Sequence, residues 1–104
     1  MDLLPQELRE QIPPLSSTQG EDDPMVWVRF FNPPWGLWSW FVVEGAPHEA
    51  DEYLLFGLVA IGAEKTLDHF TLSDIAAISG TYGLIIERDH SFVPCRLSVV
   101  HQHY

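Results

Sequence analysis

Residues 26–44, VWVRFFNPPWGLWSWFVVE, decide the fold of this chain. Apolar residues over 26–31 alternate at the two-residue spacing of a strand, and residues 38–44 are rich in the aromatic and β-branched side chains that favour extended backbone. The sequence between them, Asn-Pro-Pro-Trp-Gly at 32–36, is typical of a turn. We therefore expect two antiparallel strands joined as a hairpin.

The chain after this hairpin predicts further extended segments. Residues 53–61, YLLFGLVAI, are apolar at odd and even positions, as expected for a central strand that is covered on both faces. Residues 84–88, LIIER, favour another strand, and residues 93–100 a last extended segment interrupted at Pro94. The stretch 45–51 between the earlier strands is expected to be a loop.

A short amphipathic helix is predicted near the N-terminus. Leu4, Leu8 and Ile12 recur at helical spacing, and the pair Pro13-Pro14 ends this pattern. Residues 16–24 are polar and contain an acidic triplet, so we expect an exposed loop there.

A second short helix is predicted after residue 70. Thr71 and Asp74 have the spacing of a capping box, with Asp in place of the usual Glu or Gln, and Gly80 can close the apolar run that follows. The expected architecture is a single α+β domain over residues 1–104. It has an antiparallel sheet of four to five strands and two short helices.

Length and composition fit one globular domain. The 104 residues are 46% apolar, which is enough for one core without a metal or a disulfide. The single cysteine, Cys95, excludes an intrachain disulfide, and the N-terminus lacks the pattern of a secretory signal. The longest apolar stretch, residues 53–63, is shorter than the about 20 residues of a membrane-spanning helix. We expect a monomer in the reducing cytoplasm of a bacterial cell.

Charge is the most informative bulk property of the sequence. Fifteen Asp and Glu residues face five Lys and Arg residues, and the resulting formal net charge of -10 disfavours direct binding of nucleic acid. Ten of the fifteen acids lie in residues 1–52. Solubility alone can account for such a charge, and so can an acidic surface for a basic partner.

An acidic surface could imitate DNA only if its carboxylates gather on one face. A domain of this length is roughly 33 Å wide, a span over which duplex DNA presents roughly 19 charges. The candidate partner-binding acids lie in two stretches and are Glu21, Asp22, Asp23, Glu44, Glu49, Asp51 and Glu52.

Four tryptophans within residues 27–40 offer a second binding feature, because tryptophan often anchors protein interfaces. Trp38 and Trp40 share one face of a predicted strand, which indicates a place in the core. Trp35, in the Pro-Pro-Trp-Gly turn, is the tryptophan that we expect to contact a partner.

One group of residues could carry hydrolytic chemistry. Its acids, bases and nucleophile are Glu87, Asp89, His90 and Ser91 and, elsewhere, Asp68 and His69. Adjacent residues of a strand point in opposite directions, so the run after residue 86 does not form a triad by itself. We predict no catalytic residue, and a small hydrolase is the least favoured function. A cavity that joins His69 or His90 to a carboxylate would favour it.

Metal binding has a weaker basis still. His101-x-His103 would place two imidazoles on one face of an extended end, with His90 and Cys95 as conceivable further ligands. Zinc sites usually need three or four ligands at recognisable spacing, and this pattern does not provide it. We therefore predict no metal site and no cofactor.

The order of the local motifs resembles a small bacterial family, the domain of unknown function two-nine-five-eight. The motifs are residues 3–15 (LLPQELREQIPPL), Asp23-Pro24 with residues 28–31, residues 38–40, 56–59 and 70–75, and residues 83–94 (GLIIERDHSFVP). The resemblance covers nearly the whole chain and implies a compact single domain found on bacterial chromosomes, phages and integrating elements. It implies no catalytic residues.

Mobile elements often encode small acidic proteins that occupy the DNA-binding surfaces of host defence complexes. The expected function is therefore inhibition of a bacterial defence complex through an acidic, DNA-mimicking surface. The favoured partner is the basic surface of a type I CRISPR surveillance complex, so the protein would be an anti-CRISPR protein. The alternative is an accessory protein-binding module of a mobile element without a defence role.

Overall fold

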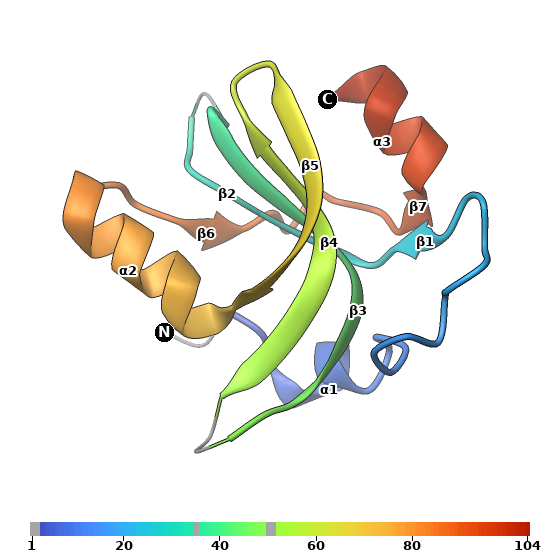
Figure 1. The fold of residues 1–104 in the computed structure, drawn as a ribbon. Coiled ribbons are helices and arrows are strands. Elements are labelled where there is room, and N and C mark those ends of the chain that lie inside the picture. Colours follow the sequence, from blue (N-terminus) through green and yellow to red (C-terminus); the bar gives the residue numbers. More distant parts are fainter. Residues whose placement is uncertain (1–2, 35, 50–51) are drawn as a thin grey trace.

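Five antiparallel strands form the main sheet of this protein in a computed structural model that describes residues 3–34, 36–49 and 52–104 (Figure 1). The strands are β2 (Val28–Phe31), β3 (Trp38–Pro47), β4 (Tyr53–Ile61), β5 (Glu64–Thr71) and β6 (Glu87–Arg88). They lie in the order β5-β4-β3-β2-β6. β2 and β3 form the predicted hairpin, and β4 is the predicted central strand between β3 and β5.

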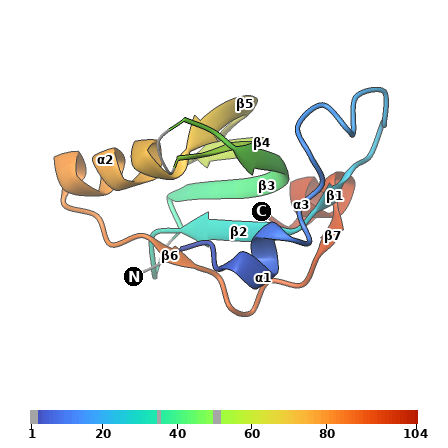
Figure 2. The same ribbon diagram turned by 90° about the horizontal axis from the view of Figure 1, so that it is seen from below.

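A two-stranded sheet and three helices complete the fold of the described residues. β1 (Met25–Val26) pairs with β7 (Cys95–Arg96), and the helices are α1 (Gln6–Arg9), α2 (Leu72–Tyr82) and α3 (Leu97–His103). Figures 1 and 2 place α2 on one side of the main sheet and α3, with the small sheet, on the other. Within the described residues, no helix is long and apolar enough to cross a membrane. The fold class is α+β, as the sequence predicts.

Each face of the main sheet covers a hydrophobic core. On the α2 side, Trp40 and Leu55 pack with Leu4 and with Ile75 of α2. The core on the α3 side is smaller, and its buried members are Val26, Phe41, Val43, Leu58, Ala60, Leu97 and Val100. Because neighbouring side chains of a strand point to opposite faces, β3 contributes to both cores. This double coverage explains the nearly continuous apolar run at residues 38–43.

β3 contains one irregularity that positions the candidate site. Its register against β4 shifts between Val42 and Glu44, so Val43 is an additional residue without a direct partner on β4. Gly57 lies opposite Val42, and a Cβ atom at Gly57 would meet the Phe41 carbonyl oxygen at 1.8 Å. The close approach of β3 and β4 at this bulge therefore requires glycine at position 57.

The predicted capping box begins α2. The Asp74 N–H donates to Thr71 Oγ1 at 3.0 Å, and the Thr71 N–H donates to the Asp74 carboxylate at 2.9 Å. The prediction that Gly80 ends this helix is wrong, because the helix continues to Tyr82. Gly83 follows in the left-handed conformation, with φ 63°, and its N–H donates to the Ser79 carbonyl.

Other boundaries differ from the sequence-based predictions. Residues 44–47 pair with residues 53–56, so β3 includes positions that were expected to be a loop. The extended stretch expected at 93–100 contains only the two residues of β7 before α3 begins. The expected strand at 26–31 is interrupted at Trp27, and only two residues of 84–88 form a strand. The sequence pattern does not predict β5, because most of its residues are exposed and polar.

Candidate functional site

The candidate site is a cavity of about 320 Å³ on the α3 side of the main sheet. It lies between the sheet and the loop of residues 16–24. Its walls combine the apolar side chains of Phe56, Leu67 and Leu97 with two exposed acids of the loop, Glu21 and Asp22. Apolar walls with a few polar groups are typical of binding sites.

The bulge in β3 builds the floor of this cavity. Because Val43 is an additional residue, Glu44 faces the same side of the sheet as Phe56 of β4, its direct partner. Phe56 in turn lies opposite His69 of β5, and the centroids of the two rings are 4.8 Å apart. Glu44, Phe56 and His69 therefore form a row across three strands, and all three line the cavity.

Glu44 holds the loop that covers the cavity. Its carboxylate accepts hydrogen bonds from the Ser16 N–H at 2.7 Å, from the Thr18 N–H at 2.9 Å and from the Thr18 hydroxyl. Burial acts to raise the pKa of this carboxyl, but the hydrogen bonds from Thr18 and Ser16 outweigh it and hold the pKa below its ordinary value of 4.5. The prediction that Glu44 belongs to an exposed acidic surface is wrong, because the residue is only 3% exposed.

Asp23 also has a structural role. Its carboxylate accepts hydrogen bonds from the Ser98 hydroxyl at 2.7 Å and from the Ser98 N–H at 2.8 Å, and thus caps the first turn of α3. These bonds lower the pKa of the Asp23 carboxyl below its ordinary value of 3.8. The carboxylates of Glu21 and Asp22, by contrast, have no hydrogen bond or ion pair with any described residue, so they are available to a ligand.

The remaining predicted acids lie in another part of the molecule. Glu49 and Glu52 lie between β3 and β4, and Glu52 accepts hydrogen bonds from the Ser73 hydroxyl and from the Ser73 N–H at the start of α2. The bond from the Ser73 hydroxyl is the largest cause that lowers the pKa of the Glu52 carboxyl. Glu52 lines a second cavity, of about 560 Å³, which shares none of its described lining residues with the first. Glu21 and Glu52 therefore line different cavities, whereas Glu44, from the same stretch as Glu52, lines the first cavity with Glu21.

The tryptophan predictions have mixed outcomes. Trp40 is buried, as predicted, and Trp38 is half-buried and stacks on it with 5.8 Å between the ring centroids. Trp35, the expected contact residue, lies outside the described residues, and so does Asp51.

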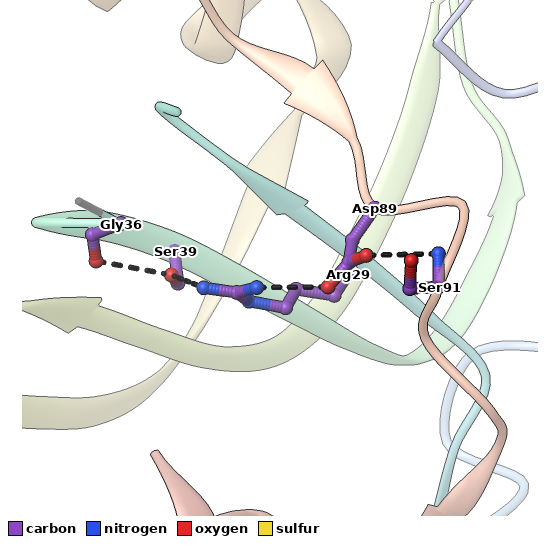
Figure 3. Close-up of polar contacts among 5 residues, drawn as sticks. All are labelled: Arg29, Gly36, Ser39, Asp89 and Ser91. Atoms are coloured by element: carbon purple, nitrogen blue, oxygen red, sulfur yellow. Dashed lines mark hydrogen bonds and ion pairs between the residues drawn. The ribbon is translucent and has the colours of Figure 1, made fainter. Parts of the chain in front are cut away.

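The acid and nucleophile considered for hydrolysis belong to a cluster around Arg29 (Figure 3). Arg29 donates from Nη1 to the Asp89 carboxylate at 2.8 Å and from Nη2 to the Ser39 hydroxyl at 3.1 Å. The other oxygen of Asp89 accepts the Ser91 N–H at 2.9 Å. The guanidinium also lies over three aromatic rings, at 4.4 Å from Phe31, 5.7 Å from Phe41 and 4.7 Å from Tyr104. Asp89 is therefore the partner of a largely buried cation, and no described histidine is hydrogen-bonded to it.

The two candidate histidines have other neighbours. His90 Nδ1 lies 3.2 Å from Arg88 Nη2, and the His69 ring packs against Phe56. The cavity does join His69 to the carboxylate of Glu44, the arrangement that would favour a hydrolase. However, this carboxylate accepts hydrogen bonds from the covering loop, and no serine or threonine hydroxyl in the described part of the chain is hydrogen-bonded to either ring. A paired nucleophile and base is thus absent from the described residues.

The arrangement considered for a metal site at the C-terminal histidines, two imidazoles on one face of an extended end, does not form. His101 and His103 lie on α3 rather than on an extended end, and residues two apart on a helix do not face each other. Across residues 3–34, 36–49 and 52–104, no group of three His, Cys, Asp or Glu side chains could hold a metal ion.

The comparison with protein families agrees with the order of motifs in the sequence. The model for the family described as "Protein of unknown function (DUF2958)" matches residues 3–102. The chain belongs to this family. No match was found among curated proteins or among solved structures. All residues that line the cavity lie within the part of the chain that the DUF2958 model matches.

Several residues of the site in this DUF2958 protein are not identified from the sequence. Phe56 and Leu97 lie in predicted extended segments, Leu67 lies in a mostly polar stretch that predicts no strand, and Thr18 lies in a polar loop. They meet through pairings between distant segments: Leu97 reaches the cavity because β7 pairs with β1. No local pattern carries that information.

Proposed function

We propose that this chain is a non-catalytic protein-binding domain that takes a basic side chain of a partner protein into the cavity above Glu44. The carrying observation is that Glu21 and Asp22, whose carboxylates have no partner among the described residues, stand beside the apolar wall of Phe56 and Leu67. Arginine and lysine suit such a site, because each has an apolar stem and a charged end.

The floor of the cavity supports the same proposal. The Glu44 carboxylate has about four positions for hydrogen-bond donors, and three are used by Ser16 and Thr18. No described residue donates to the remaining position, and Glu44 lines the cavity, so the carboxylate has an acceptor position left for a cationic donor there. The lowered pKa of Glu44 keeps this group charged at neutral pH, so the floor adds negative charge. The net charge of -10 further attracts a basic partner, most strongly at low salt.

Inhibition of a bacterial defence complex is the second candidate, and the net charge of -10 favours it. A type I CRISPR surveillance complex has basic nucleic-acid-binding surfaces, and one of their side chains would enter the cavity. Because Glu21 and Glu52 line different cavities, we propose local capture of a basic side chain rather than imitation of a DNA duplex. An accessory module of a mobile element would use the same site with a partner outside defence.

A peptide titration tests the binding proposal. The probe is a nine-residue peptide of alternating valine and arginine, and the control peptide has glutamate in place of arginine. We expect calorimetry to detect the arginine peptide alone, with an affinity that falls as salt rises. The variant Glu21→Gln/Asp22→Asn should bind the arginine peptide roughly tenfold more weakly, which corresponds to about 1.4 kcal/mol of binding free energy. The matched variant Glu7→Gln/Glu87→Gln removes the same charge from exposed acids outside the cavity and should bind like the parent. An equal loss of affinity in the two variants would contradict the proposal that the arginine side chain binds in this cavity.

A second experiment separates the two candidate partners. Purified type I surveillance complex is used as bait for the parent protein and for both double variants. Binding that blocks DNA loading, and that Glu21→Gln/Asp22→Asn abolishes, would support the defence proposal. If the arginine peptide binds and the complex does not, the accessory-module alternative gains support.

A further inference from the structure

β5 forms an edge of the main sheet, and among the described residues β4 is the one strand that pairs with it (Figure 1). It is eight residues long, whereas β6 at the opposite edge has two. Leu67, at the middle of β5, is 51% exposed. An edge strand presents unpaired backbone N–H and C=O groups, which can pair with a strand of another chain. β5 is thus the longer of the two edges of this sheet.

Two hydrogen bonds establish which backbone groups of β5 point outward. The His69 N–H donates to the Asp68 carboxylate at 2.8 Å, and the Thr71 N–H donates to the Asp74 carboxylate at 2.9 Å. These N–H groups therefore point away from β4. Because backbone groups alternate along an antiparallel strand, Lys65 and Leu67 also direct their N–H and C=O groups outward. Within the described part of the chain, no other segment donates a backbone hydrogen bond to this edge.

The side chains of the outward-pointing positions lie on the cavity side of the sheet. Leu67 is opposite Leu58, and His69 is opposite Phe56, on the face that packs against α3. A strand added to β5 would place alternate side chains on this same face, beside Leu67 and His69. A basic side chain from that strand could then extend over His69 toward Glu21 and the Glu44 carboxylate.

We propose that the partner binds as an extended basic segment that adds an antiparallel or parallel strand to β5 and places a basic side chain in the cavity. This inference rests on the proposed function and adds the mode of binding to it. Main-chain hydrogen bonds to Lys65 and Leu67 supply affinity, and the acidic cavity selects the basic side chain, as in other cases of strand addition.

A second copy of this chain is a poor occupant of the same edge. If β5 paired antiparallel with itself around Thr66, Glu64 would lie opposite Asp68. Centred on Asp68, the pairing would place the two Asp68 side chains opposite each other, and like charges directly opposite are destabilising. Centred on Leu67, it would place Lys65 opposite His69, but each copy brings two acids of β5, Glu64 and Asp68, against this single lysine, and each chain carries a net charge of -10. Charge complementarity therefore favours a basic segment of another protein.

Amide hydrogen exchange tests this mode of binding directly. In the free protein, the Lys65 and Leu67 N–H groups should exchange faster than those of Thr66 and Asp68, which point toward β4. Addition of the alternating valine–arginine peptide at saturation should slow exchange at Lys65 and Leu67 by at least about tenfold. Protection confined to the loop of residues 16–24 would overturn strand addition while leaving the cavity proposal intact.

A matched pair of variants provides the second test. Leu67→Pro and Leu67→Ala both remove the leucine side chain, but the proline also removes the outward N–H without removing a hydrogen bond to β4. Circular dichroism and thermal melts establish that both are folded. Strand addition predicts that Leu67→Pro binds the arginine peptide roughly tenfold more weakly than Leu67→Ala. Equal affinities would overturn strand addition alone, and absence of peptide binding by the parent protein would overturn both proposals.

Discussion

Arg29 and Asp89, which are 60 residues apart in the chain, form an ion pair with 2.8 Å between Nη1 and Oδ2. Their side chains are only 12% and 13% exposed. The pair joins β2 to the segment that follows β6, and the Asp89 N–H also donates to the Arg29 carbonyl at 2.8 Å. Arg29 lies in one motif of the DUF2958 resemblance and Asp89 in another, so the pair ties together two stretches that the sequence shows only as separate motifs.

Loss of this carboxylate should destabilise the protein. Asp89→Asn leaves the Arg29 guanidinium largely buried without its counter-charge, and we expect the free energy of unfolding to fall by roughly 1.5–3 kcal/mol. Urea denaturation at pH 7 measures the change. Glu87→Gln, at an exposed neighbouring acid, should change stability by less than about 0.5 kcal/mol. Similar stabilities for the two variants would mean that the ion pair contributes little.

Glu44 should make stability depend on pH. Its pKa is lower in the folded protein than the ordinary value of 4.5, so its contribution is fully present above pH 4.5 and is lost as the pH falls through the lowered folded value. Glu44→Gln places an amide group against N–H donors and should cost roughly 1–3 kcal/mol at pH 7. In urea denaturation between pH 7 and pH 3, the free energy of unfolding should fall less with decreasing pH in the variant than in the parent. A parallel pH dependence would assign the acid sensitivity to other carboxylates.

Two glycines should respond to alanine in opposite directions. Gly57→Ala brings a Cβ atom to 1.8 Å from the Phe41 carbonyl oxygen, and separation of β3 from β4 should cost about 3 kcal/mol or more. Gly80→Ala is the matched control, because it lies inside α2 with nothing within 4 Å of its added Cβ. It should raise stability by roughly 0.5–1 kcal/mol. Thermal melts of both variants measure these changes in stability. If Gly57→Ala left the stability unchanged, the close approach of β3 and β4 at this bulge would be contradicted.

Asp23→Ala should loosen α3 rather than the main sheet. The change removes both hydrogen bonds from Ser98, so the amide groups of the first turn of α3 should exchange faster. Exchange at β3 and β4 should stay close to that of the parent protein. The same loosening is expected in the parent at low pH, because the pKa of Asp23 is lowered in the folded protein and the bonds are lost on protonation. Uniform acceleration across the sheet would contradict a local cap.

The sequence predicts those elements whose burial or capping is visible in the pattern of neighbouring residues. β4 is apolar at both parities because both of its faces are covered, and residues 38–43 of β3 share that property. The capping box of Thr71 and Asp74 is visible because its two partners are three residues apart. β5 is not predicted, because an edge strand has few buried positions. The residues between Glu64 and His69 therefore show no alternation of apolar and polar side chains.

The sequence by itself determined the α+β class, the hairpin, the central strand and the strong negative charge, since propensity, periodicity and composition are properties of neighbouring residues. Only the tertiary structure decided that Glu44 is buried under Thr18, that Asp23 caps α3 and that Glu21 and Glu52 line different cavities. The physical reason is that a carboxylate's role depends on the donors that the fold brings to it. Those donors, at Thr18 and Ser98, lie 26 and 75 residues away in the chain.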